Sequence, residues 1–136
     1  MSELDAVLFA NEAFYRAFAD REMAAMADVW AAEAPVSCIH PGWGLLEGLD
    51  EVLSSWQAIL SNPDSPTITC LGARAHMQGK VGYVICYEEI EGNYLIATNI
   101  FMHEGRHWRL VHHQAGPTTD DPPIETEEDS KGSLIN

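Results

Sequence analysis

The sequence predicts an α+β domain, with helices in the N-terminal half and an antiparallel sheet after them. Two observations carry this prediction. Apolar residues recur at spacings of three and four over roughly the first sixty residues, and four strand-like stretches joined by short glycine-containing turns follow. A length of 136 residues suits one such domain. Apolar residues make up 46% and charged residues 21% of the chain, which is typical of globular proteins and excludes a fully disordered chain.

Three helices are expected, each from one apolar stripe. The stripe of the first, over residues 1–20, consists of Leu4, Val7, Leu8, Phe14, Tyr15 and Phe18. The stripe of the second, shorter helix consists of Met23, Met26, Ala27 and Trp30, and Pro35 ends it. The third helix begins near Asp50, and its stripe consists of Val52, Leu53, Trp56, Ile59 and Leu60.

Five strands are expected. The first is short and covers residues 36–40; the others cover residues 67–77, 81–90, 94–103 and 107–114. Short turns that each contain glycine separate the last four, as in hairpins, and indicate an antiparallel meander. Several strands are apolar at both alternating positions, so both faces of the sheet are expected to be covered. Helices can cover one face, and a second copy of the chain, giving a homodimer through the outer sheet face, is the simplest cover for the other.

Residues 117–136 are acidic and rich in proline, with few apolar side chains. Such a segment buries too little surface to offset its ordering entropy. We therefore expect a single domain at residues 1–116 and a flexible tail at residues 117–136.

The charge and the cysteine content of the chain limit which classes of partner it can bind and indicate its cellular compartment. Seven Lys and Arg against 21 Asp and Glu give a net charge of −14, which disfavours nucleic acid and anionic membranes as partners. No apolar run approaches the roughly 18–20 residues of a membrane span, and the acidic N-terminus does not have the pattern of a secretory signal. The three cysteines have no paired spacing and are expected to be small buried residues rather than a disulfide or zinc framework. These features predict a cytoplasmic protein.

Three stretches, residues 18–23, 40–48 and 108–117, together resemble the SnoaL-like branch of the nuclear transport factor 2-like superfamily. The resemblance covers about residues 3–117. It implies a cone-shaped, curved antiparallel sheet wrapped around three N-terminal helices, a pocket at the wide end, and dimers through the outer sheet face. The superfamily includes isomerase-like, cyclase-like and dehydratase enzymes as well as pure association modules, so the fold alone leaves the function open.

Two histidines are the candidate proton carriers. His40 ends the first strand, just before a Pro-Gly-Trp turn, and titrates near neutral pH. His112 and His113 are adjacent and must point to opposite faces of their strand. Because His112 shares alternation with Trp108 and Leu110, it is expected to face the pocket, with His113 on the dimer side. For each histidine a purely structural role is the alternative.

The candidate ligand-binding residues surround these histidines. They are Tyr15, Trp43, Trp56, Arg74 and Gln114. The position of Tyr15, late in the first helix, is similar to that of the carbonyl-polarising tyrosine of the isomerase branch, but the acid expected at the end of the first strand is absent. For Tyr15 a core role is the alternative, and for Arg74 a structural salt bridge.

Other arrangements receive less support. His40, His112 and a carboxylate would suit a metal, but no local ligand spacing supports one, so no metal or cofactor is expected. Cys38 as a nucleophile would need His40 as its base, at roughly 6–7 Å along the strand. Glu88, near a hairpin turn, is expected to belong to a solvated edge.

Together these residues predict a conical pocket for a small, largely apolar or aromatic metabolite. Cofactor-free isomerisation, cyclisation or dehydration is the chemistry that the resemblance implies for such a pocket. The alternative is a non-catalytic homodimeric association or ligand-sensing module.

Overall fold

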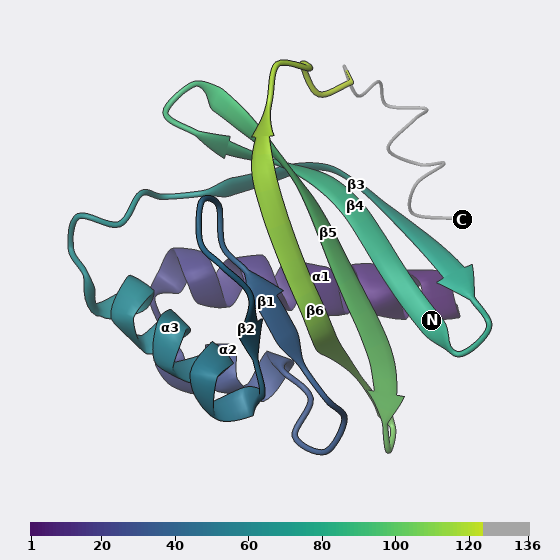
Figure 1. Cartoon of the computed structure of the whole chain (residues 1–136). Coiled ribbons are helices and arrows are strands. Elements are labelled where there is room, and N and C mark those ends of the chain that lie inside the picture. The colour runs from purple at the N-terminus through teal and green to yellow at the C-terminus, as the bar shows by residue number, and fades with distance from the viewer. Residues whose placement is uncertain (124–136) are drawn as a thin grey trace.

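The computed structural model describes residues 1–123. Three helices and a six-stranded curved sheet make up this part of the chain, and the helices lie against the concave face of the sheet (Figure 1). The α+β class predicted from the sequence is therefore confirmed. Most of the expected tail, residues 124–136, lies outside the described residues.

The three predicted helices are α1 (Glu3–Asp20), α2 (Met23–Val29) and α3 (Leu49–Ser61). The Ser2 hydroxyl caps the start of α1 by accepting from the backbone N–H of Asp5 at 3.1 Å. Arg21 ends α1 in the left-handed conformation, with φ 53°, and its guanidinium donates to the carbonyl oxygens of Asn62 and Ser65. These bonds tie the end of α1 to the loop that follows α3.

The strands are β1 (Ser37–Ile39), β2 (Leu46–Glu47), β3 (Thr69–Gln78), β4 (Val81–Ile90), β5 (Asn93–Glu104) and β6 (His107–Thr118). Their order in the sheet is β2-β1-β6-β5-β4-β3. The meander from β3 to β6 is antiparallel, as predicted, whereas β1 pairs parallel with β6. The two-residue strand β2 was not expected, and β6 runs to Thr118, past the expected domain end at residue 116.

The core fills the space between α1 and the concave face of the sheet. Its largest fully buried side chains include Trp56, Phe14, Phe101, Met26 and Leu110. Where α1 crosses β4 the approach is so close that a Cβ on Gly82 would lie 2.6 Å from Val7 Cγ2. This glycine lets the helix pack directly on the strand.

A β-bulge in β6 reverses the alternation of its side chains. Ile100 of β5 pairs with His112 and Phe101 pairs with Leu110, so Val111 is one extra residue in β6. Before the bulge Leu110 points inward, and after it His113 does. The prediction that His112 and Gln114 face the pocket, with His113 on the outer face, is therefore wrong, because it assumed unbroken alternation.

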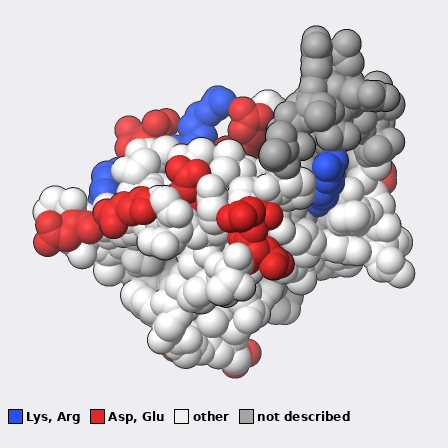
Figure 2. Space-filling model, turned by 90° about the horizontal axis from the view of Figure 1, so that it is seen from above, with Lys and Arg blue, Asp and Glu red and all other residues white. Residues whose placement is uncertain are grey.

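Acidic side chains outnumber basic ones on the face shown in Figure 2. This distribution agrees with the strong negative charge of the sequence. Among residues 1–123, no helix is long and apolar enough to span a membrane.

Candidate functional site

A pocket of about 440 Å³ opens at the wide end of the cone, between α3, the loop after it and the concave face of the sheet. Its apolar walls include Phe18, Trp43, Trp56, Ile59, Ile68 and Leu95. Its ionisable side chains are His40, Glu88 and His113, all of them buried. No Lys or Arg is among the described residues that line it. The pocket thus combines aromatic and apolar walls with three titratable lining groups.

Glu88 on β4 is the carboxyl group of the pocket. Its side chain is 2% exposed, and one carboxyl oxygen, Oε2, accepts a 2.6 Å hydrogen bond from the Tyr15 hydroxyl. Burial raises the pKa of Glu88 from 4.5 to about 7, although the bond from Tyr15 opposes this rise. Glu88 can therefore exchange a proton at neutral pH. The prediction that Glu88 lies on a solvated edge is wrong; it follows Val84 and Cys86 on the inward side of β4.

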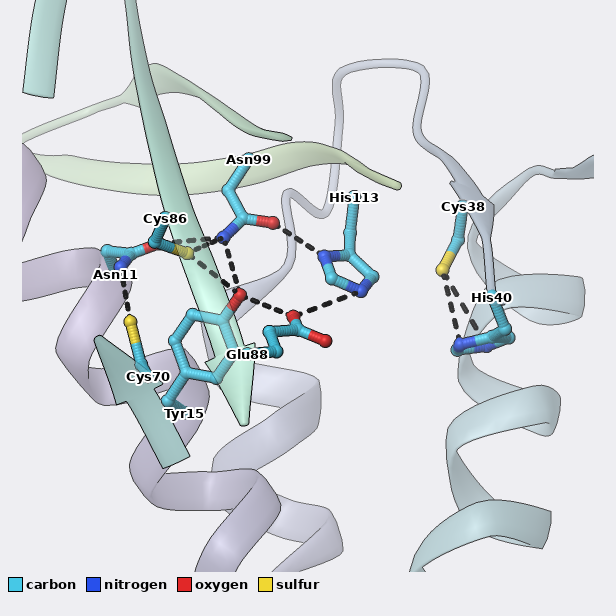
Figure 3. Close-up of polar contacts among 9 residues, drawn as sticks. All are labelled: Asn11, Tyr15, Cys38, His40, Cys70, Cys86, Glu88, Asn99 and His113. Atoms are coloured by element: carbon cyan, nitrogen blue, oxygen red, sulfur yellow. Dashed lines mark hydrogen bonds and ion pairs between the residues drawn. The ribbon is translucent and has the colours of Figure 1, made fainter. Parts of the chain in front are cut away.

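His113 lies beside Glu88. Its Nδ1 is 2.5 Å from Asn99 Oδ1, and its Nε2 is 4.0 Å from Glu88 Oε2 (Figure 3). The amide nitrogen of Asn99 donates to Asn11 Oδ1 at 2.8 Å and to the Tyr15 hydroxyl at 3.1 Å. Burial, chiefly, lowers the pKa of His113 from 6.5 to about 3, so its ring is neutral at physiological pH.

Tyr15 connects this network to the helix. Its hydroxyl is buried among Glu88, Cys86 and Asn99 (Figure 3). Burial and the nearby carboxyl of Glu88 hold the pKa of Tyr15 well above its usual value of 10, so it stays a proton donor. Tyr15 thus lies beneath the pocket, behind Glu88.

His40 lies in the pocket wall between Trp43 and Trp56. The centroid of its imidazole ring is 4.8 Å from the ring centroid of each tryptophan. The hydroxyl of Ser55 donates to the Val52 carbonyl, so it accepts from Nε2–H of His40 at 2.9 Å. Burial lowers the pKa of His40 to about 4. His40 is thus neutral and anchored to α3, while Trp43, 47% exposed, stands at the pocket mouth.

Cys38 does not have the environment of a nucleophile. Its sulfur lies 3.6 Å from His40 Nε2, closer than the spacing along the strand suggests. However, burial raises the pKa of Cys38 to about 12, which keeps the thiol protonated and unreactive. In residues 1–123, no group of three or more His, Cys, Asp or Glu residues is arranged to hold a metal ion.

The structure brings together some of the predicted site residues and separates others. His40, Trp43 and Trp56 line the pocket. His112 instead lies on the outer side of β6, with Nδ1 2.7 Å from the Ser37 hydroxyl. Arg74 and Gln114 are exposed, away from the pocket. Their predicted places in the site are therefore wrong.

Four residues of the site were missed from the sequence: Asn11, Glu88, Asn99 and His113. An available signal was strand alternation, because Glu88 and Asn99 lie in phase with buried apolar neighbours on β4 and β5. A polar residue at an inward position must find a partner there.

The curved sheet, the enclosed helix and the pocket at the wide end define a nuclear transport factor 2-like protein. Residues 7–119 match the family model of the SnoaL-like domain, so the chain belongs to the SnoaL-like family of this superfamily. This membership supports a small-molecule-binding domain.

Solved structures agree with this assignment. A candidate dehydratase of the NTF2-like family from Streptomyces avermitilis is 28% identical, with a TM-score of 0.79, over 87% of this chain and 97% of that chain. A candidate association domain of calcium/calmodulin-dependent protein kinase type II from Thiobacillus denitrificans is 29% identical, with a TM-score of 0.71, over 81% and 93%. The relatives thus include both functional classes expected from the sequence.

A curated relative is the F-box protein SKIP8 of Arabidopsis thaliana. The two sequences are 30% identical over 113 residues, which is 81% of this chain and 48% of the relative. The chain therefore spans about half the length of this relative.

Proposed function

We propose that this protein binds a small, uncharged, largely apolar or aromatic metabolite and performs cofactor-free acid/base chemistry on it. The observation that carries the proposal is a buried carboxyl group, Glu88, whose pKa of about 7 suits proton transfer at neutral pH, in a pocket walled by Trp43 and Trp56. Without Lys or Arg among its described lining residues, the pocket offers nothing to offset the charge of a phosphate or carboxylate ligand. A neutral ligand fits it best.

The roles of the ionisable residues follow from their surroundings. Glu88 gives or takes the proton, and Tyr15 keeps it oriented through the 2.6 Å hydrogen bond. His113, neutral and fixed by Asn99, offers a hydrogen-bond acceptor rather than a second base, because burial lowers its pKa to about 3. His40 shapes the wall, because its Nε2–H is committed to Ser55. One carboxyl group that can both take and give a proton near pH 7 suits isomerisation or dehydration, in which a proton leaves one atom of the substrate and another atom receives one.

Proton transfer can be tested without knowing the natural substrate. The probe is 2-indanone, a neutral aromatic ketone whose α-protons exchange slowly with D₂O. We expect the wild-type protein to accelerate this exchange, measured by proton NMR, with a rate that rises as pH passes about 7 and Glu88 ionises. Glu88→Gln should abolish the acceleration and Glu89→Gln, one residue away on β4, should keep it. Exchange at the buffer rate in wild type would contradict the catalytic part of the proposal.

Native mass spectrometry of freshly purified protein tests the binding part. A retained organic adduct would name the ligand class. Added mass that matches a metal ion would overturn the metal-free reading of the site. The same spectrum weighs the assembly, which we propose to be a homodimer.

The second candidate function is a homodimeric association or ligand-sensing module. It is favoured by the outer sheet face, where Tyr83, Ile85, Tyr87, Ile96 and Ile100 are only half-buried, and by the likeness to an association domain. Ile96→Glu, at the middle of this face, should convert a dimer into monomers in sedimentation analysis. A wild-type monomer would contradict this candidate, and a dimer without ketone exchange would favour it over the enzyme.

A further inference from the structure

The hydrogen bonds of Asn99 determine where the proton of His113 lies. The amide nitrogen of Asn99 donates to Asn11 Oδ1 and to the Tyr15 hydroxyl. The side-chain oxygen of Asn99 therefore faces His113, and an amide oxygen can only accept. Because Nδ1 of His113 lies 2.5 Å from that oxygen, Nδ1 must carry the ring proton. In the neutral ring, Nε2 is then an unprotonated acceptor.

The acceptor Nε2 of His113 faces another acceptor. Glu88 Oε2 lies 4.0 Å away, too far for a direct hydrogen bond. In residues 1–123, no side chain donates a hydrogen bond to Nε2: Phe14 presents an aromatic ring at 5.0 Å, and His40 has its own Nε2–H bonded to Ser55. Glu88 and His113 both line the pocket. The base of the pocket thus presents two acceptor atoms with no donor between them.

We infer that this pair of atoms recognises a hydroxyl group of the ligand, and that Asn99 is the positioning residue that makes His113 an acceptor there. An oxygen placed about 2.8–3.0 Å from each of two atoms fits a separation of this size. The ligand hydroxyl donates to Nε2 of His113 and, when Glu88 is protonated, accepts from its carboxyl group. The inference rests on the proposed function, which it deepens: the substrate class becomes neutral aromatic or alicyclic alcohols and enols.

The ring of His113 can be observed directly. Two-bond ¹⁵N–¹H correlation spectra at pH 8 should show Nδ1 protonated and Nε2 unprotonated in wild type. Asn99→Asp keeps an acceptor oxygen and should keep this tautomer, whereas Asn99→Leu removes the oxygen and should move the proton to Nε2. His112, bonded to Ser37, is an internal reference that should not change. A protonated Nε2 in wild type overturns the inference, whether or not the variants fold.

Recognition of a hydroxyl is tested with p-cresol and p-xylene, which differ by a hydroxyl in place of a methyl group. In NMR titrations, wild type should bind p-cresol roughly tenfold more tightly than p-xylene, since the hydroxyl can form hydrogen bonds with His113 and Glu88 that a methyl group cannot form. In Asn99→Leu, which moves the ring proton to Nε2, His113 can no longer accept from the ligand hydroxyl. The preference for p-cresol should therefore fall in this variant while p-xylene still binds, because Asn99 does not line the pocket.

The results of these binding experiments distinguish a failure of this inference from a failure of the proposed function. Equal binding of both compounds by wild type overturns hydroxyl recognition and leaves the aromatic pocket standing. Failure of both to bind overturns hydroxyl recognition as well. If 2-indanone exchange and a retained adduct are also absent, the proposed function falls with it.

Discussion

At the scale of single residues, the unusual feature is a cluster of polar side chains in the core. Asn11, Glu88, Asn99 and His113 are each at most 2% exposed and lie between α1 and the sheet. Apolar residues of similar size would pack there without a desolvation cost. Hydrogen bonds offset this cost: the Tyr15 hydroxyl donates to Glu88, and the Asn99 amide donates to Asn11 and Tyr15. Nε2 of His113 and the carboxyl group of Glu88, both at the pocket, are not hydrogen-bonded to each other.

Glu88→Gln is expected to stabilise the protein at high pH. A pKa raised from 4.5 to about 7 means that the folded state holds the proton more tightly. The contribution of Glu88 to stability is therefore fully present below pH 4.5 and is lost as pH rises through 7, by roughly 3 kcal/mol. Glutamine does not ionise, so the stability of the variant does not fall in this way. The difference in the free energy of unfolding between Glu88→Gln and wild type should therefore grow in favour of the variant as pH rises through 7. Urea unfolding at pH 5 and pH 8 measures it, with Glu89→Gln as the control; an equal difference at both pH values would contradict the buried carboxyl.

Tyr15→Phe should raise the pKa of Glu88 further, because the hydrogen bond from Tyr15 now lowers it. The carboxyl resonance of Glu88, followed by ¹³C NMR, should titrate at higher pH than in wild type. The variant should also lose roughly 1–3 kcal/mol of stability, since Asn99 and Glu88 each lose a partner. An unchanged titration would mean that Tyr15 does not govern the carboxyl.

At the scale of elements, the bulge in β6 decides which histidine enters the pocket. Deleting Val111 removes the extra residue and makes His112 the direct neighbour of Leu110. Leu110 and His113 are then two positions apart, so regular alternation points both of these side chains inward. We expect this deletion to fold and to keep the pKa of His113 below its usual range in histidine NMR titrations. Inserting an alanine after Val111 should instead expose His113 or unfold the protein. A His113 that titrates normally in the deletion variant would contradict this account.

The helices and the meander could be predicted from the sequence because their signals are local. Apolar stripes mark the helices, and glycine turns mark the hairpins. The bulge could not be predicted, because one extra residue in a strand has no composition signal. Alternation along β4 indicates that Glu88 points inward, but its hydrogen-bond partner could not be predicted, because Tyr15 lies on another element 73 positions away in the sequence. The site thus depends on long-range pairs, whereas the fold is apparent from short-range patterns.

At the scale of the whole molecule, charge opposes self-association. A net charge of −14 makes two copies repel each other. If the homodimer proposed above forms through the apolar outer face, salt should strengthen it, because screening weakens the repulsion and leaves apolar burial intact. Sedimentation at 50 and 500 mM NaCl should show a severalfold lower dissociation constant at high salt. Dissociation by salt would instead indicate an interface held by ion pairs.

The parallel pairing of β1 with β6 has a consequence for how the protein is made. Ser37 and His112 meet across this pairing although they lie 75 positions apart in the sequence. Closing so long a loop is slow compared with forming helices or hairpins. During synthesis, His40 emerges well before His113, which lies on the opposite wall of the pocket and belongs to the last strand of the domain. The helices can therefore form while the strands are still being synthesised, whereas the pocket assembles only after β6 is complete.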